Sequence, residues 1–221
     1  RLYRSGLGIS VNGGILCLND LDFDSSSNYS DLLIRDIRRE CSMRGFSGVM
    51  LDFELPPHDP LLQFVREADE YFDNIGIPLY IPESYANAAH ASHICSSTAV
   101  TGGSFAESCR SLYARYGNRA ALQYEPVCID FELPSPKGIS DRTTSAELKE
   151  IMLREHVVPY FSSELCANYF TYRKDGKSRF ALFDDSRSLV RKLETAKHIG
   201  IKTAFICLPD VGDTFQDLKR L

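Results

Sequence analysis

The chain has 221 residues and a net charge of -5, and 43% of its residues are hydrophobic while 25% are charged. This composition is typical of a globular protein with a sizeable core, and the length favours a single domain over residues 1–221. The acidic balance argues against a nucleic-acid partner, which requires a basic face. No apolar run approaches the ~20 residues of a membrane span, so we expect no membrane partner.

Short apolar runs alternate along the chain with amphipathic stretches of helical period. Glycines follow several of the predicted helices and end them. We predict strands at residues 15–19, 48–54, 77–82, 97–101, 120–125 and 202–208, and helices at 30–44, 60–76, 104–116, 145–156 and 186–198.

Strands that are almost continuously hydrophobic, each followed by a helix, are typical of a parallel sheet covered by helices. About six such strands are visible, whereas a complete (β/α)8 barrel typically needs ~250 residues. We therefore predict the α/β class, with a shortened or incomplete (β/α)8 barrel. Residues 166–183 do not follow this alternation of strands and helices. Their sequence predicts a β-hairpin around the turn Asp175-Gly176, which is part of an insertion at about 160–185.

The seven cysteines are scattered, odd in number and contain no C-x-x-C pair. Most lie in apolar runs, as Cys17 and Cys207 do, which is typical of reduced thiols that pack as small hydrophobic residues. We therefore expect buried, unpaired thiols and a cytoplasmic setting.

One acidic pattern occurs twice, as LDFELPP at 51–57 and as IDFELPSP at 129–136. In a strand, residues two apart share a face, so Asp52 and Glu54 would point the same way, about 6.6 Å apart at Cα. The first copy directly follows a buried strand, at the carboxyl end where parallel α/β folds assemble their active sites. It is therefore the better candidate for an active site.

The second copy follows Pro126, which cannot donate to the hydrogen-bond ladder of a central strand. Asp130 and Glu132 are therefore expected on an edge strand or, more simply, in a loop.

The carboxylate pair of the first copy suits acid/base chemistry, because a charged Asp52 can keep a neighbouring Glu54 protonated long enough to donate. The alternative is that both side chains merely solvate the end of a strand. A divalent metal bound by Asp52, Glu54, His58 and Asp59 is a weaker alternative, because this spacing matches no standard metal site.

Residues 45–54, GFSGVMLDFE, resemble the fourth-strand signature DGxDxDxE of glycoside hydrolase family 18, the chitinase-like (β/α)8 barrels. The tail is similar to the spore-associated, peptidoglycan-directed branch of that family. In that branch a β-hairpin insertion leads to F-D-D-x-x-S/T, and here the motif is Phe183-Asp-Asp-Ser-Arg-Ser188. The two matches cover about 30–55 and 160–208.

The resemblance implies a bacterial protein, cytoplasmic or spore-associated, that hydrolyses a β-1,4-linked N-acetylhexosamine glycan of peptidoglycan or chitin type. It implies no cofactor and no metal. Glu54 would be the general acid/base. Asp52 would orient the substrate's acetamido group, whose carbonyl attacks the anomeric carbon in a substrate-assisted retaining route.

The chain also departs from the family pattern. Ser47 and Met50 stand at the first two acidic positions, residues 99–103 offer no Tyr for the family's Met-x-Tyr-Asp, and the chain contains no Trp. The first one or two barrel strands are missing from the pattern. These departures favour the alternative of a catalytically degenerate relative that binds glycan or is structural.

Other strand ends could contribute to a substrate-binding mouth. Tyr85 or Tyr124 could replace the missing Tyr, and an acidic rim would be formed by Asp20, Glu83, Glu125 and Asp210. A second copy of the chain could complete a short barrel, so a homodimer is a further expectation.

Overall fold

The structure is a computed structural model that describes residues 13–21, 30–134 and 140–207. The chain divides into two compact units, Arg1–Ser96 and Ser97–Leu221. Among the described residues no helix is long and apolar enough to cross a membrane.

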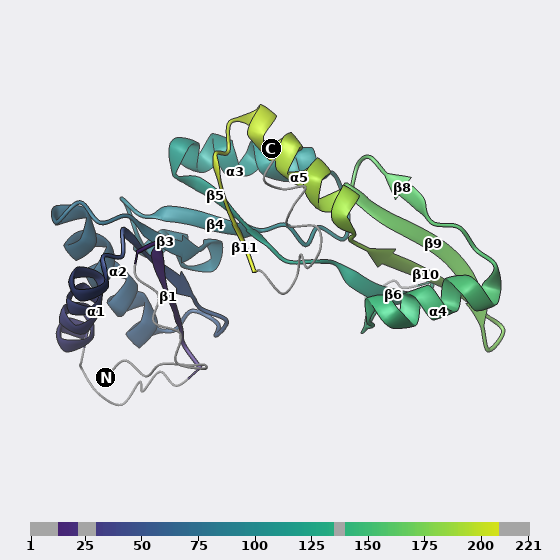
Figure 1. Ribbon diagram of the computed structural model, residues 1–221, viewed down its shortest axis with the longest axis horizontal. Coiled ribbons are helices and arrows are strands. Elements are labelled where there is room, and N and C mark those ends of the chain that lie inside the picture. The colour runs from purple at the N-terminus through teal and green to yellow at the C-terminus, as the bar shows by residue number, and fades with distance from the viewer. Residues whose placement is uncertain (1–12, 22–29, 135–139, 208–221) are drawn as a thin grey trace. The chain divides into compact units, whose positions relative to one another are not determined.

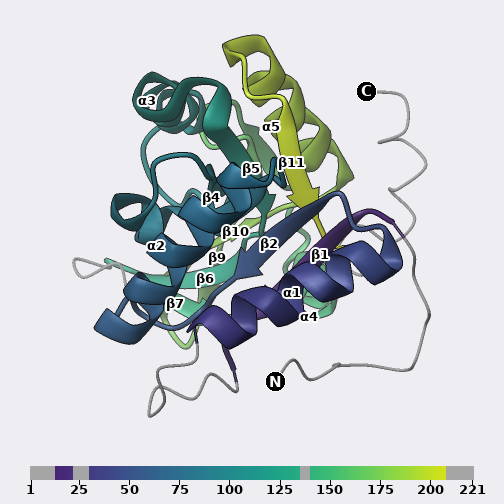
Figure 2. The same cartoon turned by 90° about the vertical axis from the view of Figure 1, so that its left-hand side faces the viewer.

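The first unit contains a parallel sheet in the order β1 (Ile15–Asn19), β2 (Gly48–Asp52), β3 (Leu79–Pro82) and β4 (His93–Ser97). The connections include α1 (Ser30–Arg44), α2 (Asp59–Asn74) and the short 3-10 helix η1 (Glu83–Ala88). Figure 2 shows α1 and α2 side by side in front of these strands.

The helix α2 forms because its apolar residues recur at helical spacing and because Pro60 occupies its first turn, where the missing N–H costs nothing. Its buried stripe consists of Leu61, Phe64, Val65, Ala68 and Phe72. From this stripe, Phe64 packs its ring against Phe53, which directly follows β2.

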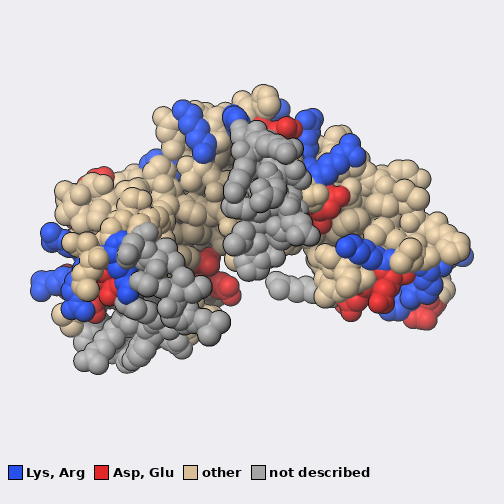
Figure 3. Space-filling view, in the orientation of Figure 1, with Lys and Arg blue, Asp and Glu red and all other residues tan. Residues whose placement is uncertain are grey.

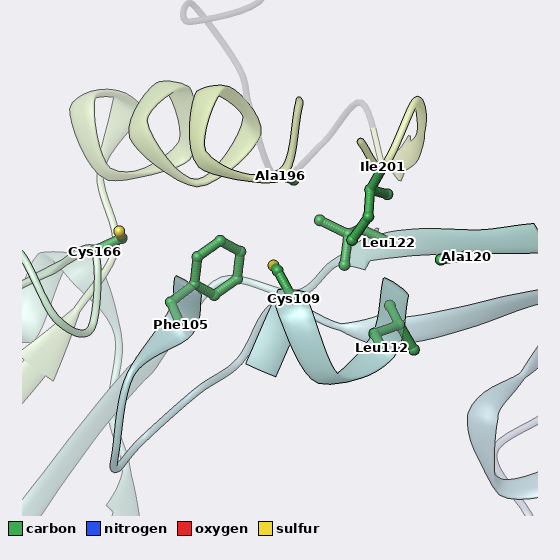
Figure 4. Packing of buried hydrophobic residues seen from close by; sticks show 8 residues of the cluster. All are labelled: Phe105, Cys109, Leu112, Ala120, Leu122, Cys166, Ala196 and Ile201. Atoms are coloured by element: carbon green, nitrogen blue, oxygen red, sulfur yellow. The ribbon is translucent and has the colours of Figure 1, made fainter. Parts of the chain in front are cut away.

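The second unit contains a parallel pair of strands, β5 (Ala120–Tyr124) and β11 (Thr203–Ile206). The helix α3 (Phe105–Tyr116), the 3-10 helix η2 (Gly117–Arg119) and α5 (Ser186–Ile199) accompany them. Figure 4 shows the apolar cluster that joins α3, β5 and the end of α5, formed by Phe105, Cys109, Leu112, Ala120, Leu122, Cys166, Ala196 and Ile201.

An antiparallel sheet also belongs to the second unit (Figure 1). Its strands are ordered β7 (Ser140–Arg142), β6 (Cys128–Leu133), β10 (Lys177–Phe183), β9 (Ala167–Lys174) and β8 (Tyr160–Ser162). The helix α4 (Ser145–Glu155) packs Leu148 against Phe170, Tyr172 and Ala181 on one face of this sheet.

The predicted hairpin is confirmed. Asp175 and Gly176 join β9 to β10 with φ angles of 53° and 77°, the left-handed pair that a two-residue turn between twisted strands requires. The antiparallel region is larger than the expected insertion, because it begins at Cys128 and includes α4.

Six parallel strands among the described residues confirm the predicted incomplete barrel, since a complete one has eight.

Three local predictions were wrong. The strand expected at 97–101 is β4, at His93–Ser97. The second acidic copy lies in β6, between two other strands rather than in a loop. Cys17 and Cys207 are exposed, whereas the buried free thiols are Cys41, Cys95, Cys109 and Cys166.

Candidate active site

The first acidic copy lies where β2 ends, as the sequence predicts. Asp52 is the last residue of β2 and is half-buried, and Glu54 two residues later is exposed. Between them, Phe53 is 9% exposed and packs against the rings of Phe64 and Tyr85, with centroids 6.2 and 5.6 Å away. Because neighbouring residues of an extended chain point to opposite sides, this leaves Asp52 and Glu54 on the side away from the α2 layer.

The backbone that carries Glu54 is held by a buried carboxylate. Asp20 directly follows β1 and is fully buried. Its Oδ1 accepts a hydrogen bond from the Glu54 N–H at 3.0 Å, and its Oδ2 accepts one from the Leu55 N–H at 2.9 Å. The expectation that Asp20 contributes to an acidic rim was therefore wrong, because its charge faces backbone amides rather than solvent.

Tyr85, expected to contact substrate, has a different partner. It is fully buried in η1, and its hydroxyl donates to the Leu55 carbonyl at 2.9 Å. Burial and the neighbouring negative charge of Asp20 raise the pKa of Tyr85 to about 12. The hydroxyl therefore stays protonated and keeps donating to the loop after β2.

A buried thiol two strands away from Asp52, that of Cys95, senses the charge of Asp52. Burial, and secondly the charge of Asp52, raise the pKa of Cys95 in β4 to about 12. Cys95 is therefore a neutral thiol at neutral pH and does not compete with Glu54 as an acid.

The other predicted binding residues lie in different surroundings. Glu83 begins η1 and is half-buried, so Asp20, Asp52 and Glu83 follow or end three adjacent strands at one edge of the sheet. In the second unit Tyr124 is buried against Leu189. Asp210 lies outside the described residues.

Glu125, in the second unit, is exposed just after β5. Its Oε2 accepts a hydrogen bond from the Ser97 hydroxyl at 2.7 Å, and its N–H donates to the Thr98 hydroxyl at 3.1 Å. The carboxylate and the backbone of Glu125 are thus bound to Ser97 and Thr98, the first two residues of the second unit.

The acidic residues of the second copy form ion pairs and hydrogen bonds within the antiparallel sheet. Asp130 accepts from the guanidinium of Arg179 at 2.7 and 2.9 Å and from the Tyr172 hydroxyl at 2.6 Å. The hydrogen bonds to Asp130 raise the pKa of Arg179. The pKa of Tyr172 is raised to about 12, mainly by burial and secondly by its hydrogen bond to Asp130. Glu132 pairs with Lys177 at 2.7 Å. Figure 3 shows acidic and basic side chains intermingled around α4.

The last residues of the F-D-D-x-x-S motif form the N-terminal cap of α5. Asp185 is the N-cap of α5 and accepts from the Ser188 N–H at 2.9 Å, while the Ser188 hydroxyl accepts from the Asp185 N–H at 2.6 Å. This reciprocal capping box satisfies amides that have no partner within the helix.

No group of three or more His, Cys, Asp and Glu side chains in the described part of the chain is arranged to hold a metal ion. The alternative site built on Asp52, Glu54, His58 and Asp59 therefore lacks the convergent geometry that a metal requires.

No family model and no curated protein matches this sequence. Solved structures do match. The spore cortex-lytic enzyme SleL of Bacillus megaterium is 14% identical with a TM-score of 0.59, over 87% of this chain and 55% of the SleL chain. A chitinase of Chromobacterium violaceum is 13% identical with a TM-score of 0.67, over 92% of this chain and 78% of its own.

A class V chitinase of Nicotiana tobaccum, determined in complex with NAG4, is 12% identical with a TM-score of 0.55, over 87% of this chain and 74% of its own. At these identities the similarity shows the fold alone. The chain has the fold of chitinases and spore cortex-lytic enzymes, in a partial form that spans just over half of the SleL chain.

Proposed function

We propose that the chain is a glycoside hydrolase that acts on a β-1,4-linked N-acetylhexosamine glycan of the peptidoglycan or chitin type. The observation that carries the proposal is the position of Glu54, an exposed carboxyl group two residues beyond the carboxyl end of β2 on a backbone fixed by hydrogen bonds. Parallel α/β folds place their catalytic groups at this end of the strands. The fold shared with chitinases supports the same assignment.

In the proposed reaction Glu54 protonates the glycosidic oxygen. The substrate's acetamido carbonyl attacks the anomeric carbon, and the leaving sugar departs with the proton from Glu54. Asp52, close by at the end of β2, orients the acetamido group and stabilises the positively charged cyclic intermediate. Glu54 then takes a proton from the water that opens this intermediate, which restores the acid.

Turnover of a chromogenic chitobioside and of purified peptidoglycan tests the proposal. In Glu54→Gln the turnover should fall by about 10²–10⁴-fold, the usual contribution of a general acid. Glu132→Gln is a matched control, because it changes an exposed glutamate in the same Asp-Phe-Glu-Leu sequence. Equal turnover in wild type and Glu54→Gln would refute the assignment of Glu54.

A glycan-binding relative without catalysis is the second candidate. Two observations favour it: the hydroxyl of Tyr85 is bonded to the Leu55 carbonyl, and Met50 stands where the resembled motif has an Asp. Saturable calorimetric binding of an N-acetylglucosamine tetramer, without turnover of either substrate, would establish this candidate. Turnover that is abolished by a chelator would instead favour the metal-dependent alternative.

A further inference from the structure

We propose that Asp20 is a positioning residue for Glu54: its buried carboxylate fixes the peptide groups on both sides of the Glu54 Cα and so directs the acid. This inference rests on the proposed function of Glu54. Sequence alone gave Asp20 a place on a solvent-facing rim, and its hydrogen bonds assign it a different task.

The register of the sheet explains why Asp20 reaches this loop. Asn19 is paired with Asp52, so β1 and β2 end side by side and the next residues of the two strands are neighbours. Each oxygen of the Asp20 carboxylate accepts one N–H, that of Glu54 at 3.0 Å and that of Leu55 at 2.9 Å. These N–H groups belong to the two peptide planes that meet at the Glu54 Cα, so its backbone direction is set from both sides.

A second contact holds the same loop from another element. Tyr85, in η1, donates its hydroxyl to the Leu55 carbonyl at 2.9 Å and packs its ring edge-on against Phe53 at 5.6 Å. The residues before and after Glu54 are thus anchored, while the Glu54 side chain itself remains exposed. A fixed backbone that carries an exposed acid is the arrangement that general acid catalysis requires.

Burying a carboxylate away from water is costly unless it is hydrogen-bonded, so the two N–H groups that Asp20 accepts offset the cost of its burial. An asparagine in its place has one oxygen and one NH2 group, so it would turn a donor toward one of the two N–H groups. Asp20→Asn therefore keeps the size of the side chain while breaking one half of the clamp.

The first unit supplies a matched control in Asp69, a second buried aspartate that accepts backbone N–H groups. Asp69 binds the amides of His90, Ala91 and Ser92, just before β4 begins and thus at the amino ends of the strands. Asp69→Asn makes the same chemical change as Asp20→Asn, but it does so away from Glu54.

Steady-state kinetics on the chromogenic chitobioside, at a temperature where all variants are folded, test the inference. We expect Asp20→Asn to lower kcat by about 100-fold, as small misplacements of a catalytic group do, with KM within roughly twofold of the wild-type value. Tyr85→Phe should give a smaller loss in the same direction, and Asp69→Asn should keep the wild-type kcat. Equal kcat values for Asp20→Asn and Asp69→Asn would overturn the inference.

Amide hydrogen exchange supplies a readout that does not depend on catalysis. The amides of Glu54 and Leu55 should lose protection in Asp20→Asn and keep it in Asp69→Asn. If the wild-type chain turns over no glycan, the proposed function fails, and the exchange result alone decides whether the clamp exists. Unchanged protection of both amides in Asp20→Asn would overturn the inference whatever the kinetics show.

Discussion

Lys192 and Asp184 form an ion pair at 2.6 Å in which both side chains are fully buried. Asp184 directly precedes α5, and Lys192 lies within that helix, where its Nζ also donates to the Thr98 carbonyl at 3.0 Å. Burial raises the pKa of Asp184, and the charge of Lys192 acts against this effect. The pair thus ties the start of α5 to the segment that follows β4.

Breaking this pair from one side should be costly. Lys192→Met leaves the Asp184 carboxylate buried without its counter-ion, and we expect a loss of about 3–5 kcal/mol in the free energy of unfolding. The double variant Lys192→Met/Asp184→Asn removes both charges and should be more stable than Lys192→Met alone. Urea denaturation of wild type, Lys192→Met, Asp184→Asn and the double variant measures this, and a loss in the double variant equal to the sum of the two single losses would show that the two charges do not interact.

Asp69 should make the chain sensitive to acid. Its burial favours the neutral form, but hydrogen bonds from the Ser92 hydroxyl and from three backbone amides outweigh burial and lower the pKa of Asp69. A folded-state pKa below the unfolded value of about 3.9 gives stability that is present above that value and is lost as the pH falls through the folded pKa.

We therefore expect Asp69→Asn to cost about 1–3 kcal/mol at pH 7, because the amide replaces an acceptor by a donor. The difference in urea midpoint between wild type and Asp69→Asn should shrink toward acid pH. A difference of equal size at pH 7 and at pH 3 would contradict the assignment of this pH dependence to Asp69.

Gly200 ends α5 in a conformation that suits glycine. Its φ of 114° is positive, and a Cβ at this position would lie 3.0 Å from ring carbons of Tyr113. Gly200→Ala should therefore destabilise the chain by more than about 1 kcal/mol. Gly102→Ala is the control, since a Cβ there meets nothing within 4 Å, and its thermal midpoint should match that of the wild type.

Thiol reactivity should separate the cysteines by exposure. Cys17 and Cys207 are exposed, whereas burial raises the pKa of both Cys95 and Cys109 to about 12. Because the thiolate is the reactive form, a maleimide should label the two exposed cysteines first in the native chain. Peptide mass mapping after brief labelling checks this, and early modification of Cys95 would contradict the described burial.

The periodic elements could be predicted from sequence because each depends on local pattern. The helix α2 shows its apolar stripe directly, and the Asp175-Gly176 turn identifies the hairpin between β9 and β10. The strand β4 was missed because His93-Ile-Cys-Ser-Ser97 carries a weak apolar signal. Residues 99–101, which contain Val100, have a sequence more typical of a strand than that of β4.

The contacts that decide the site could not be predicted in the same way. One of the two partners of β6, the strand β10, lies more than 40 residues along the chain, so the sequence near Asp130 does not indicate that Arg179 will pair with it. The task of Asp20 depends likewise on two amides that lie 34 and 35 residues away in the sequence. Long-range pairing, rather than composition, separates the two acidic copies.

The anchoring of the β2 loop through main-chain amides has a practical use in crystallography. Since Asp20 binds the backbone at residues 54 and 55, exchange of the side chain at 54 leaves that anchoring untouched. Glu54→Gln is therefore a suitable trap for soaking with oligosaccharides. It would show an uncleaved sugar chain against a loop in its native conformation, and the electron density would identify the preferred glycan.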